Sequence, residues 1–256
     1  VWYRVGSRNE PIGKTGISHM LEHMMFAGTP SIGPKQFSLT VQRNGGVDNA
    51  YTTSDYTAYY ENFAADRVLF GLELEADRMA HLLIGEQQFQ PERQVVIEER
   101  RLRIEDQPAS VLGEVMRATA FLAHPYRWPV IGWLSDIEGY TREDLVQHYR
   151  TYYAPNNATL VVAGDIRKDD LLPRIQALFG KIPRGPDLPQ LVTVEPPQRG
   201  ERRVFVKKEA ELPPLQTFTL TTREYIHSPG YVDEVVAQVD LPITVGERAD
   251  LFPGSR

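Results

Sequence analysis

The sequence contains no cysteine, and this absence excludes three kinds of chemistry. None of its 256 residues offers a thiol that could form a disulfide, hold zinc as a thiolate or act as a nucleophile. No apolar run is long enough to span a bilayer as a helix. An excess of positive charge is also lacking. The formal net charge is −6, which argues against nucleic acid as a partner because such partners require a basic face.

A glycine-rich phosphate loop is missing as well. Gly45 and Gly46 are adjacent, but no G-x-G-x-x-G pattern and no Lys-Ser/Thr pair accompanies them, so they are better read as a turn. The hydrophobic share of 41% is enough for one large domain or two small ones. Helical and strand patterns alternate along the chain, which predicts an α+β or α/β fold rather than an all-helical one.

What the sequence does contain is a dense chemical motif, His19-Met20-Leu21-Glu22-His23. On a helix, His19 and His23 project from one face, so a single metal ion can reach both imidazoles. Glu22 lies on nearly the same face, where it can approach a water bound to the metal without being a ligand. The pattern reads H-x-x-E-H, the reverse of the H-E-x-x-H zinc-protease signature. Two histidines at this spacing also occur by chance, so a third ligand is needed to decide.

A candidate third ligand lies in a second acidic segment, where Pro91 and Glu92 favour the start of a helix. Glu92 and Glu99 share one face of that helix with Val95 or Val96, which are expected to be buried, whereas Glu98 projects to the side. A buried carboxylate needs a cation, and a zinc ion held by the two histidines would supply one. Pairing of these glutamates with nearby arginines is the simpler alternative, and the residues alone leave it open.

Together the two segments resemble the pitrilysin family of zinc metallopeptidases, to which insulin-degrading enzyme and mitochondrial processing peptidase belong. Glu99 follows His23 by 76 positions, within the narrow range of that family, and Glu92 matches a further family glutamate seven positions earlier. The resemblance implies that His19, His23 and Glu99 bind one zinc ion per chain. It implies that Glu22 is the general base and that Glu92 is a supporting carboxylate.

Other segments strengthen the resemblance, which covers residues 1–220 and is closest to bacterial peptidases of about processing-peptidase size. The matching segments are Phe26–Thr29, Asn44–Thr52, Leu74–Met79, Tyr153–Ala158 and Val161–Asp165. In the family, the strand that contains Asn49, Ala50 and Tyr51 is a sheet edge that pairs with the substrate backbone, as edge strands can.

The resemblance also implies an architecture: an α+β fold in which a mixed β-sheet packs with helices to form one half of a clamshell. Residues 1–220 would be the zinc-binding catalytic domain, and residues 221–256 a poorly matched tail, either a linker or the start of a second domain. Nothing in the sequence matches a complete second half. A homologous second half, a partner subunit or a homo-oligomer is therefore expected, and the analogy favours the bacterial periplasm over the cytoplasm.

The expected function is hydrolysis of peptide bonds in peptides or unfolded protein segments. The rival from another class is a non-catalytic core or scaffold subunit. Such paralogues usually lose part of the H-x-x-E-H set, which is complete here. A structural zinc protein is a second rival, but three ligands beside a glutamate suit an open catalytic site better than a closed four-ligand one.

Local patterns predict the individual elements. Helices are expected at 16–27, 34–44, 65–84, 91–106, 110–122 and 168–180, after Thr141, and at 231–237; strands are expected at 1–6, 47–53, 56–62, 158–163, 202–208 and 215–222. His124 and His148 are expected to be loop and surface residues outside the motif.

Overall fold

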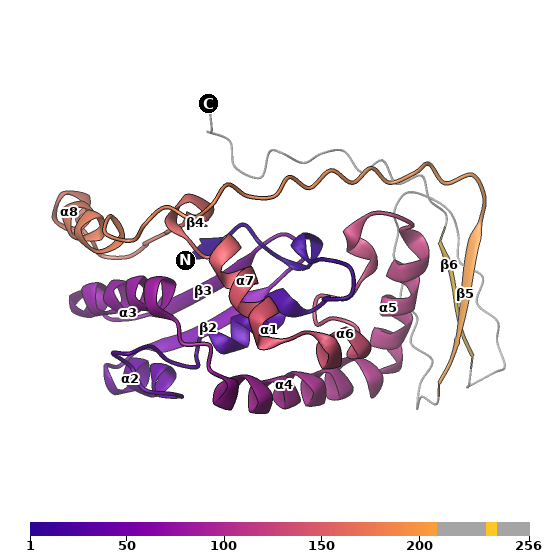
Figure 1. The fold of residues 1–256 in the computed structure, drawn as a ribbon, viewed down its shortest axis with the longest axis horizontal. Helices are drawn as coiled ribbons and strands as arrows, with labels where there is room; N and C mark the ends of the chain where they lie inside the picture. Colours follow the sequence, from indigo (N-terminus) through magenta and orange to yellow (C-terminus); the bar gives the residue numbers. More distant parts are fainter. Residues whose placement is uncertain (209–233, 240–256) are drawn as a thin grey trace. The chain divides into compact units, whose positions relative to one another are not determined.

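The computed structural model describes residues 1–208 and 234–239, which fall into two compact units (Figure 1). Unit 1 contains residues Val1–Leu102 and Trp128–Leu191, and unit 2 contains Arg103–Arg127 together with the described residues from Val192 onward. Every residue of the predicted site lies in unit 1. The predicted strand at 215–222 lies outside the described residues.

A four-stranded sheet organises unit 1. Its strands are β1 (Trp2–Tyr3), β2 (Val47–Thr52), β3 (Thr57–Asn62) and β4 (Ala158–Thr159), in the order β2-β3-β1-β4. All three neighbouring pairs are antiparallel. β2 and β3 form a hairpin in which Val47 lies opposite Asn62 and Thr52 opposite Thr57. The predicted hairpin is therefore confirmed to within one residue at its turn, and β2 lies at an edge of the sheet.

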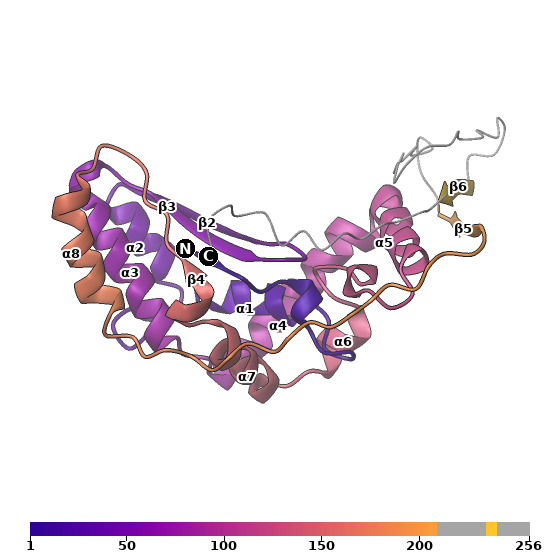
Figure 2. The ribbon, with the colours of Figure 1, turned by 90° about the horizontal axis from the view of Figure 1, so that it is seen from above.

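Helices cover one face of this sheet, and the motif helix lies directly against β2 (Figure 2). The helices of unit 1 are α1 (Ile17–Met24), α2 (Phe37–Arg43), α3 (Val68–His81), α4 (Glu86–Arg100), α6 (Leu134–Gly139), α7 (Arg142–Tyr152) and α8 (Lys168–Phe179). α7 begins with the predicted capping arrangement, in which Thr141 and Asp144 each accept the other's backbone N–H.

The core between sheet and helices contains side chains from α1, β1 and β3. Met20, Leu21 and Met24 of α1 are fully buried, as are Tyr3 and Tyr59 of the sheet. Because apolar residues occupy the inner face of α1, the hydrophobic effect fixes the rotation of the helix about its axis. That rotation determines where the two motif histidines point.

Two glycines determine where α1 begins. Gly16 caps the helix with φ +86°, and Gly132 has φ +91° in the loop that crosses it. A Cβ atom at Gly16 would lie 2.3 Å from the carbonyl oxygen of Ile131, and one at Gly132 would lie 2.3 Å from that of Thr15. Both the left-handed backbone and the close crossing therefore require glycine at these positions.

The second acidic helix begins earlier than the sequence predicts. The prediction placed Pro91 in the first turn, but α4 starts at Glu86 after an extended Gly85, so Pro91 lies inside the helix. Gln87 and Gln88 are good helix formers, and they extend the helix toward its N-terminus. The helix continues into a π-helical turn, Arg101–Glu105, so its predicted end before Pro108 is confirmed.

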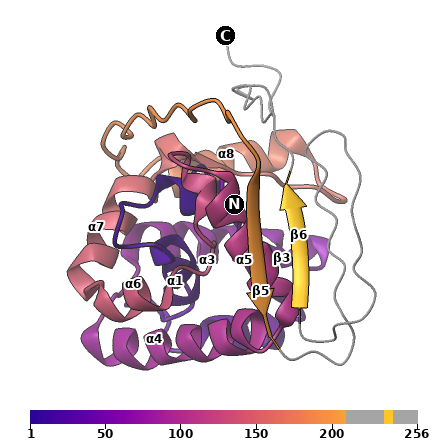
Figure 3. The same ribbon diagram turned by 90° about the vertical axis from the view of Figure 1, so that its right-hand side faces the viewer.

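Unit 2 contains α5 (Pro108–Ala120) and an antiparallel hairpin of β5 (Arg202–Lys207) and β6 (Glu234–Val239), seen in Figure 3. Leu112 and Val206 form a small apolar cluster between α5 and β5. The helix predicted for 231–237 is wrong where the structure describes it, because residues 234–237 belong to β6. The β-branched valines of that segment favour a strand once β5 offers a partner.

Candidate metal centre

The structure brings together the three side chains that the sequence singled out as metal ligands. His19 and His23 come from α1 and Glu99 from α4, and their ligand atoms all lie within 4.8 Å of one another. Glu99 Oε2 is 3.1 Å from His23 Nε2 and 3.7 Å from His19 Nε2. Among the residues that the structure describes, this is the one group of three or more such side chains with metal-ligand spacing.

The two imidazole–carboxylate separations are close to those of a tetrahedral zinc site. With zinc–ligand bonds of about 2.0–2.2 Å, two ligand atoms of a tetrahedron lie roughly 3.3–3.6 Å apart. The two imidazole–carboxylate distances bracket that range, and the rings of His19 and His23 meet edge to face with centroids 4.7 Å apart. Two imidazoles and one carboxylate are a donor set that zinc accepts at catalytic sites, with the fourth position open.

The second glutamate of α4, Glu92, contacts His23 from the other side. Its Oε1 lies 2.8 Å from Nδ1 of His23. Burial lowers the pKa of His23, but its contacts with Glu92 and Glu99 outweigh burial and raise that pKa to about 9. The Glu92 carboxylate on Nδ1 fixes the ring so that Nε2 faces Glu99. A carboxylate on the second ring nitrogen is the usual outer contact of a metal-binding histidine.

Glu92 and Glu99 are both partly buried on the side of α4 that faces α1, whereas Glu98 is exposed. Glu98 pairs with Arg101 at 2.5 Å, so the arginine alternative holds for Glu98. The burial of the valines was only half predicted: Val96 is fully buried, but Val95 is 49% exposed. The earlier start of α4 does not alter this phase, since residues seven apart share a face wherever the helix begins.

Glu22 lies on α1 between the two histidines and contacts the sheet. Its Oε2 accepts a hydrogen bond of 2.5 Å from Thr52 Oγ1 at the end of β2. The edge strand β2 also holds Asn49, Ala50 and Tyr51, so the predicted substrate strand lies next to the predicted base. The backbone N–H of Ala50 donates to the side chain of its own neighbour, Asn49, at 2.8 Å.

Sequence reasoning missed two supports of α1. Glu10 accepts the backbone N–H groups of Gly16 and Ser18, each at 2.8 Å, and thereby caps the helix N-terminus; an acidic residue shortly before a helix is the signal that could have found it. His148 was predicted to be a surface residue, but it is buried on α7, and its Nε2 lies 3.0 Å from Ser18 Oγ of α1. Burial lowers the pKa of His148 to about 3.

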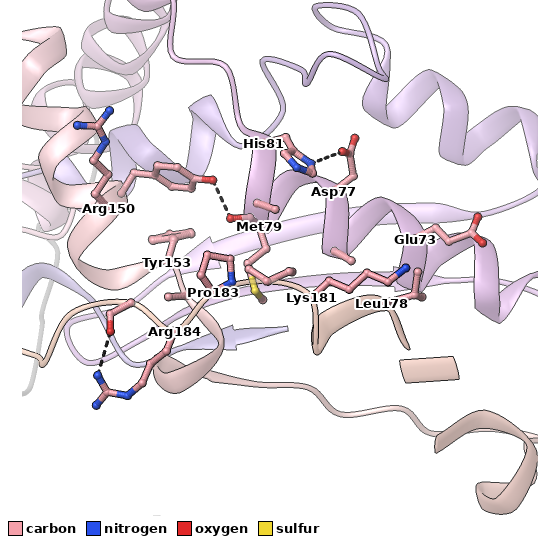
Figure 4. Close-up of a pocket in the computed structure, with 16 residues that line it drawn as sticks. Glu73, Asp77, Met79, His81, Arg150, Tyr153, Leu178, Lys181, Pro183 and Arg184 are labelled. Carbon is pink, nitrogen blue, oxygen red and sulfur yellow. Dashed lines mark hydrogen bonds and ion pairs between the residues drawn. The ribbon is translucent and has the colours of Figure 1, made fainter. Parts of the chain in front are cut away.

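A cavity of about 630 Å³ lies elsewhere in unit 1, between α3, α7 and the chain that follows α8 (Figure 4). His81 and Asp77 contact each other at 2.8 Å on its wall. None of the predicted site residues lines it, so the metal centre is defined by its converging side chains and not by this cavity.

Comparisons with known proteins agree with this geometry. The model of the insulinase family, peptidase family M16, matches residues 1–132, and a model described as the peptidase M16 inactive domain matches residues 139–222. The zinc protease PqqE of Helicobacter pylori is 38% identical over 211 residues, which are 82% of this chain and 48% of that protein. The probable mitochondrial-processing peptidase subunit beta of Arabidopsis thaliana is 31% identical over 197 residues, 77% of this chain and 37% of that protein.

Solved structures show the same likeness in the fold. A protease from Helicobacter pylori superposes with a TM-score of 0.76 at 38% identity, covering 78% of this chain and 48% of its own. The first half of the periplasmic protease PqqL of Escherichia coli gives a TM-score of 0.69 at 23% identity, over 77% of this chain and 43% of that one. The chain spans about half the length of the curated relatives it matches, 48% and 50% for the first two. Since a family model covers more than half of the sequence, the chain belongs to the insulinase family of zinc peptidases, family M16.

Proposed function

We propose that this chain is the zinc-binding half of a metalloendopeptidase that hydrolyses peptide bonds in peptides or unfolded protein segments. The observation that carries the proposal is the convergence of His19, His23 and Glu99 at zinc-ligand spacing, with Glu22 one residue from the second histidine. His19, His23 and Glu99 would hold one zinc ion. Bound zinc would polarise the scissile carbonyl and lower the pKa of a water molecule to about 7.

The residues of the chain then have separate tasks. Glu22 takes the proton of the attacking water and passes it to the nitrogen of the leaving amine. Glu92 keeps the ring of His23 oriented, since it lies 2.8 Å from Nδ1. Each role places a carboxylate where it touches either a ligand or the reacting water.

Substrate would bind by adding a strand to the open edge of β2, along Asn49, Ala50 and Tyr51. The N–H of Ala50 supports this assignment: it bonds the Asn49 side chain instead of β3, as expected of a donor directed away from the hairpin. A substrate backbone that pairs with an edge strand replaces such local contacts with main-chain hydrogen bonds. This pairing needs an extended segment, which accounts for peptides and unfolded protein as the substrate class.

Residues 1–220 would act as one catalytic domain, with residues 221–256 as a linker or the start of the next domain. The relatives are about twice as long, so a homologous second half, a partner subunit or a second copy would close over the site. The likeness to a periplasmic protease of Escherichia coli favours the bacterial periplasm over the cytoplasm. Fractionation of the native cell with an antibody to this chain would test that location.

Glu22→Gln and His23→Ala test the assignment of base and ligand. Glu22→Gln should keep zinc and fold but lose roughly 10²–10⁴ in hydrolysis, the usual contribution of general base catalysis. His23→Ala should lose the metal. Elemental analysis and a fluorogenic peptide assay measure both effects. Zinc loss in Glu22→Gln, with residual activity in proportion to metal, would make Glu22 a ligand and refute the scheme.

Hydrolysis by the 256-residue chain alone should be very slow, because half of the expected enclosure is missing and positioning supplies much of the rate. Adding the remaining half of the Helicobacter pylori protease is the direct complementation experiment. Full metal-dependent turnover by the chain alone, as a verified monomer, would show that no second half is needed. Zinc binding without activity under any complementation would favour the scaffold subunit instead.

A further inference from the structure

One contact in unit 1 joins the proposed base to the proposed substrate strand. Thr52 Oγ1 lies 2.5 Å from Glu22 Oε2. Thr52 is the last residue of β2, and Glu22 belongs to α1, which packs against that strand. Both side chains are partly buried. A charge-assisted O–H···O⁻ bond of this length is among the stronger side-chain contacts in proteins.

Neighbouring groups fix the direction of this bond. Thr57, which lies opposite Thr52 in the hairpin, has its Oγ1 2.9 Å from the carbonyl oxygen of Val5 and 3.4 Å from Thr52 Oγ1. The single hydroxyl proton of Thr57 therefore goes to Val5 or, more weakly, to Thr52. An ionised carboxylate only accepts, so the single hydroxyl proton of Thr52 is donated to Glu22.

Two buried tyrosines lie close to this pair. The hydroxyls of Tyr59 and Tyr153 lie 2.8 Å apart, and both side chains are buried. Burial raises the pKa of both tyrosines, and the Glu22 carboxylate raises it further. Both hydroxyls are therefore neutral at physiological pH, and they add no negative charge near Glu22.

We propose that Thr52 is a positioning residue for the general base: it holds Oε2 of Glu22 against the end of β2, so that Oε1 is the oxygen that takes the proton. The inference rests on the proposed role of Glu22. It assigns β2 a second task, because the strand that would pair with substrate also orients the base. Strand β2 would then determine both where a peptide lies and where the proton acceptor is placed.

Two substitutions separate the hydroxyl from the shape of the side chain. Thr52→Val keeps the volume and the β-branched form that suits a strand but removes the donor. It leaves no buried donor unsatisfied, because Thr57 still has the carbonyl of Val5. Thr52→Ser restores the donor. Ser38→Ala is a matched control, since Ser38 donates to Asp48 at 2.6 Å from α2 to the other end of β2.

Crystal structures of the zinc-loaded chain with each substitution give a readout independent of activity. Glu22 Oε2 should remain at hydrogen-bond distance from residue 52 in Thr52→Ser and should leave that place in Thr52→Val. Elemental analysis should show full zinc in both variants, because Thr52 is not a ligand. An unmoved Glu22 carboxylate in Thr52→Val would overturn the proposal, whether or not hydrolysis is fast enough to measure.

The rate readout uses the chain complemented with the second half of the Helicobacter pylori protease. Thr52→Val should lower kcat by about 10- to 100-fold with KM unchanged, the scale expected when a catalytic group is misplaced by about 1 Å. Thr52→Ser and Ser38→Ala should stay close to the unchanged chain. If Thr52→Val is fully active while Glu22→Gln is inactive, the proposed role of Thr52 is overturned but the proposed function is not. Full activity of Glu22→Gln would overturn the proposed function, and this inference with it.

Discussion

Unit 1 contains two clusters in which glutamates face basic side chains, and the two clusters differ in burial and in the kind of basic side chain. The first is buried under the hairpin, where Arg78 of α3 pairs with Glu75 and with Glu61, the latter at 2.8 Å. The Arg78 guanidinium also lies 4.3 Å from the ring centre of Phe37. Burial raises the pKa of Glu61. Burial also raises the pKa of Glu75, but the charge of Arg78 and the hydrogen bonds from Glu61 and Arg78 together outweigh it and lower that pKa. Arg78 keeps its charge at any physiological pH.

The second cluster is the candidate metal centre, where Glu92 and Glu99 face imidazoles. An imidazole can give up its proton and bind a metal, whereas a guanidinium can do neither. The side chains of this cluster are also more accessible, at 11% to 24%, against 1% for Arg78 and 3% for Glu75. The buried, permanently charged Arg78 therefore stabilises the fold. The half-buried imidazoles of His19 and His23 can instead exchange a proton for a metal ion.

The largest effect is expected from breaking the closed cluster. Arg78→Met should cost about 3–5 kcal/mol of unfolding free energy, because the buried carboxylate of Glu75 loses its cation and Glu61 loses a hydrogen-bond donor. Urea unfolding followed by circular dichroism measures it. Adding Glu61→Gln and Glu75→Gln to the same chain should restore much of the loss. An unchanged urea midpoint for Arg78→Met would contradict this account of the cluster.

A comparison of neighbouring glutamates on α4 tests the open cluster. Glu99→Gln should weaken zinc binding strongly, because the substitution replaces a charged ligand with a neutral amide. Glu98→Gln should leave the affinity unchanged, since Glu98 is exposed and pairs with Arg101. Competition against a chromophoric chelator gives both affinities. A larger loss at Glu98 would mean that the face of α4 has been assigned one residue out of phase.

The outer carboxylate of the open cluster should matter less than the ligand. Glu92→Gln can still accept the Nδ1 proton of His23 but without its charge, and changes of this kind typically cost 10- to 100-fold in metal affinity. The same chelator assay measures it, with Glu98→Gln again as control. Wild-type zinc affinity in Glu92→Gln would separate Glu92 from the metal centre.

The effect that is smallest at neutral pH, and that grows as the pH falls, is a pH dependence at the back of α1. The pKa of His148 is about 3 in the folded chain against about 6.5 when unfolded. The unfolded chain therefore binds more protons, and stability present above about pH 6.5 is lost as the pH falls toward 3. His148→Gln should flatten this part of the profile of unfolding free energy against pH. A profile of unchanged slope would show that another group controls acid stability.

How far the sequence predicts this site depends on whether a pattern is local. The helical spacing of His19 and His23, the turn at Gly45-Gly46 and the strand patterns that follow it are local, and α1, β2 and β3 agree with prediction closely. The start of α4 and the exposure of Val95 were not predicted, because they depend on where α4 meets its neighbours. β4 is two residues long where a strand over 158–163 was expected, and Val161 is 64% exposed. No pattern within α4 could say that Glu92 and Glu99 would meet the same imidazole.

The crossing of Gly16 and Gly132 has a consequence for anyone who wishes to alter this protein. A Cβ at either glycine would lie 2.3 Å from a backbone oxygen of the other segment. Neither position can therefore accept a side chain unless the other segment moves away. A mutant library that varies the loop around Gly132 in search of new specificity would thus also shift the first turn of α1. A side chain at position 132 would therefore displace His19 and His23 before any selection for activity began. Positions 16 and 132 should be held constant, and diversity should be introduced at exposed residues of β2 such as Val47 and Tyr51, which are 64% and 38% accessible.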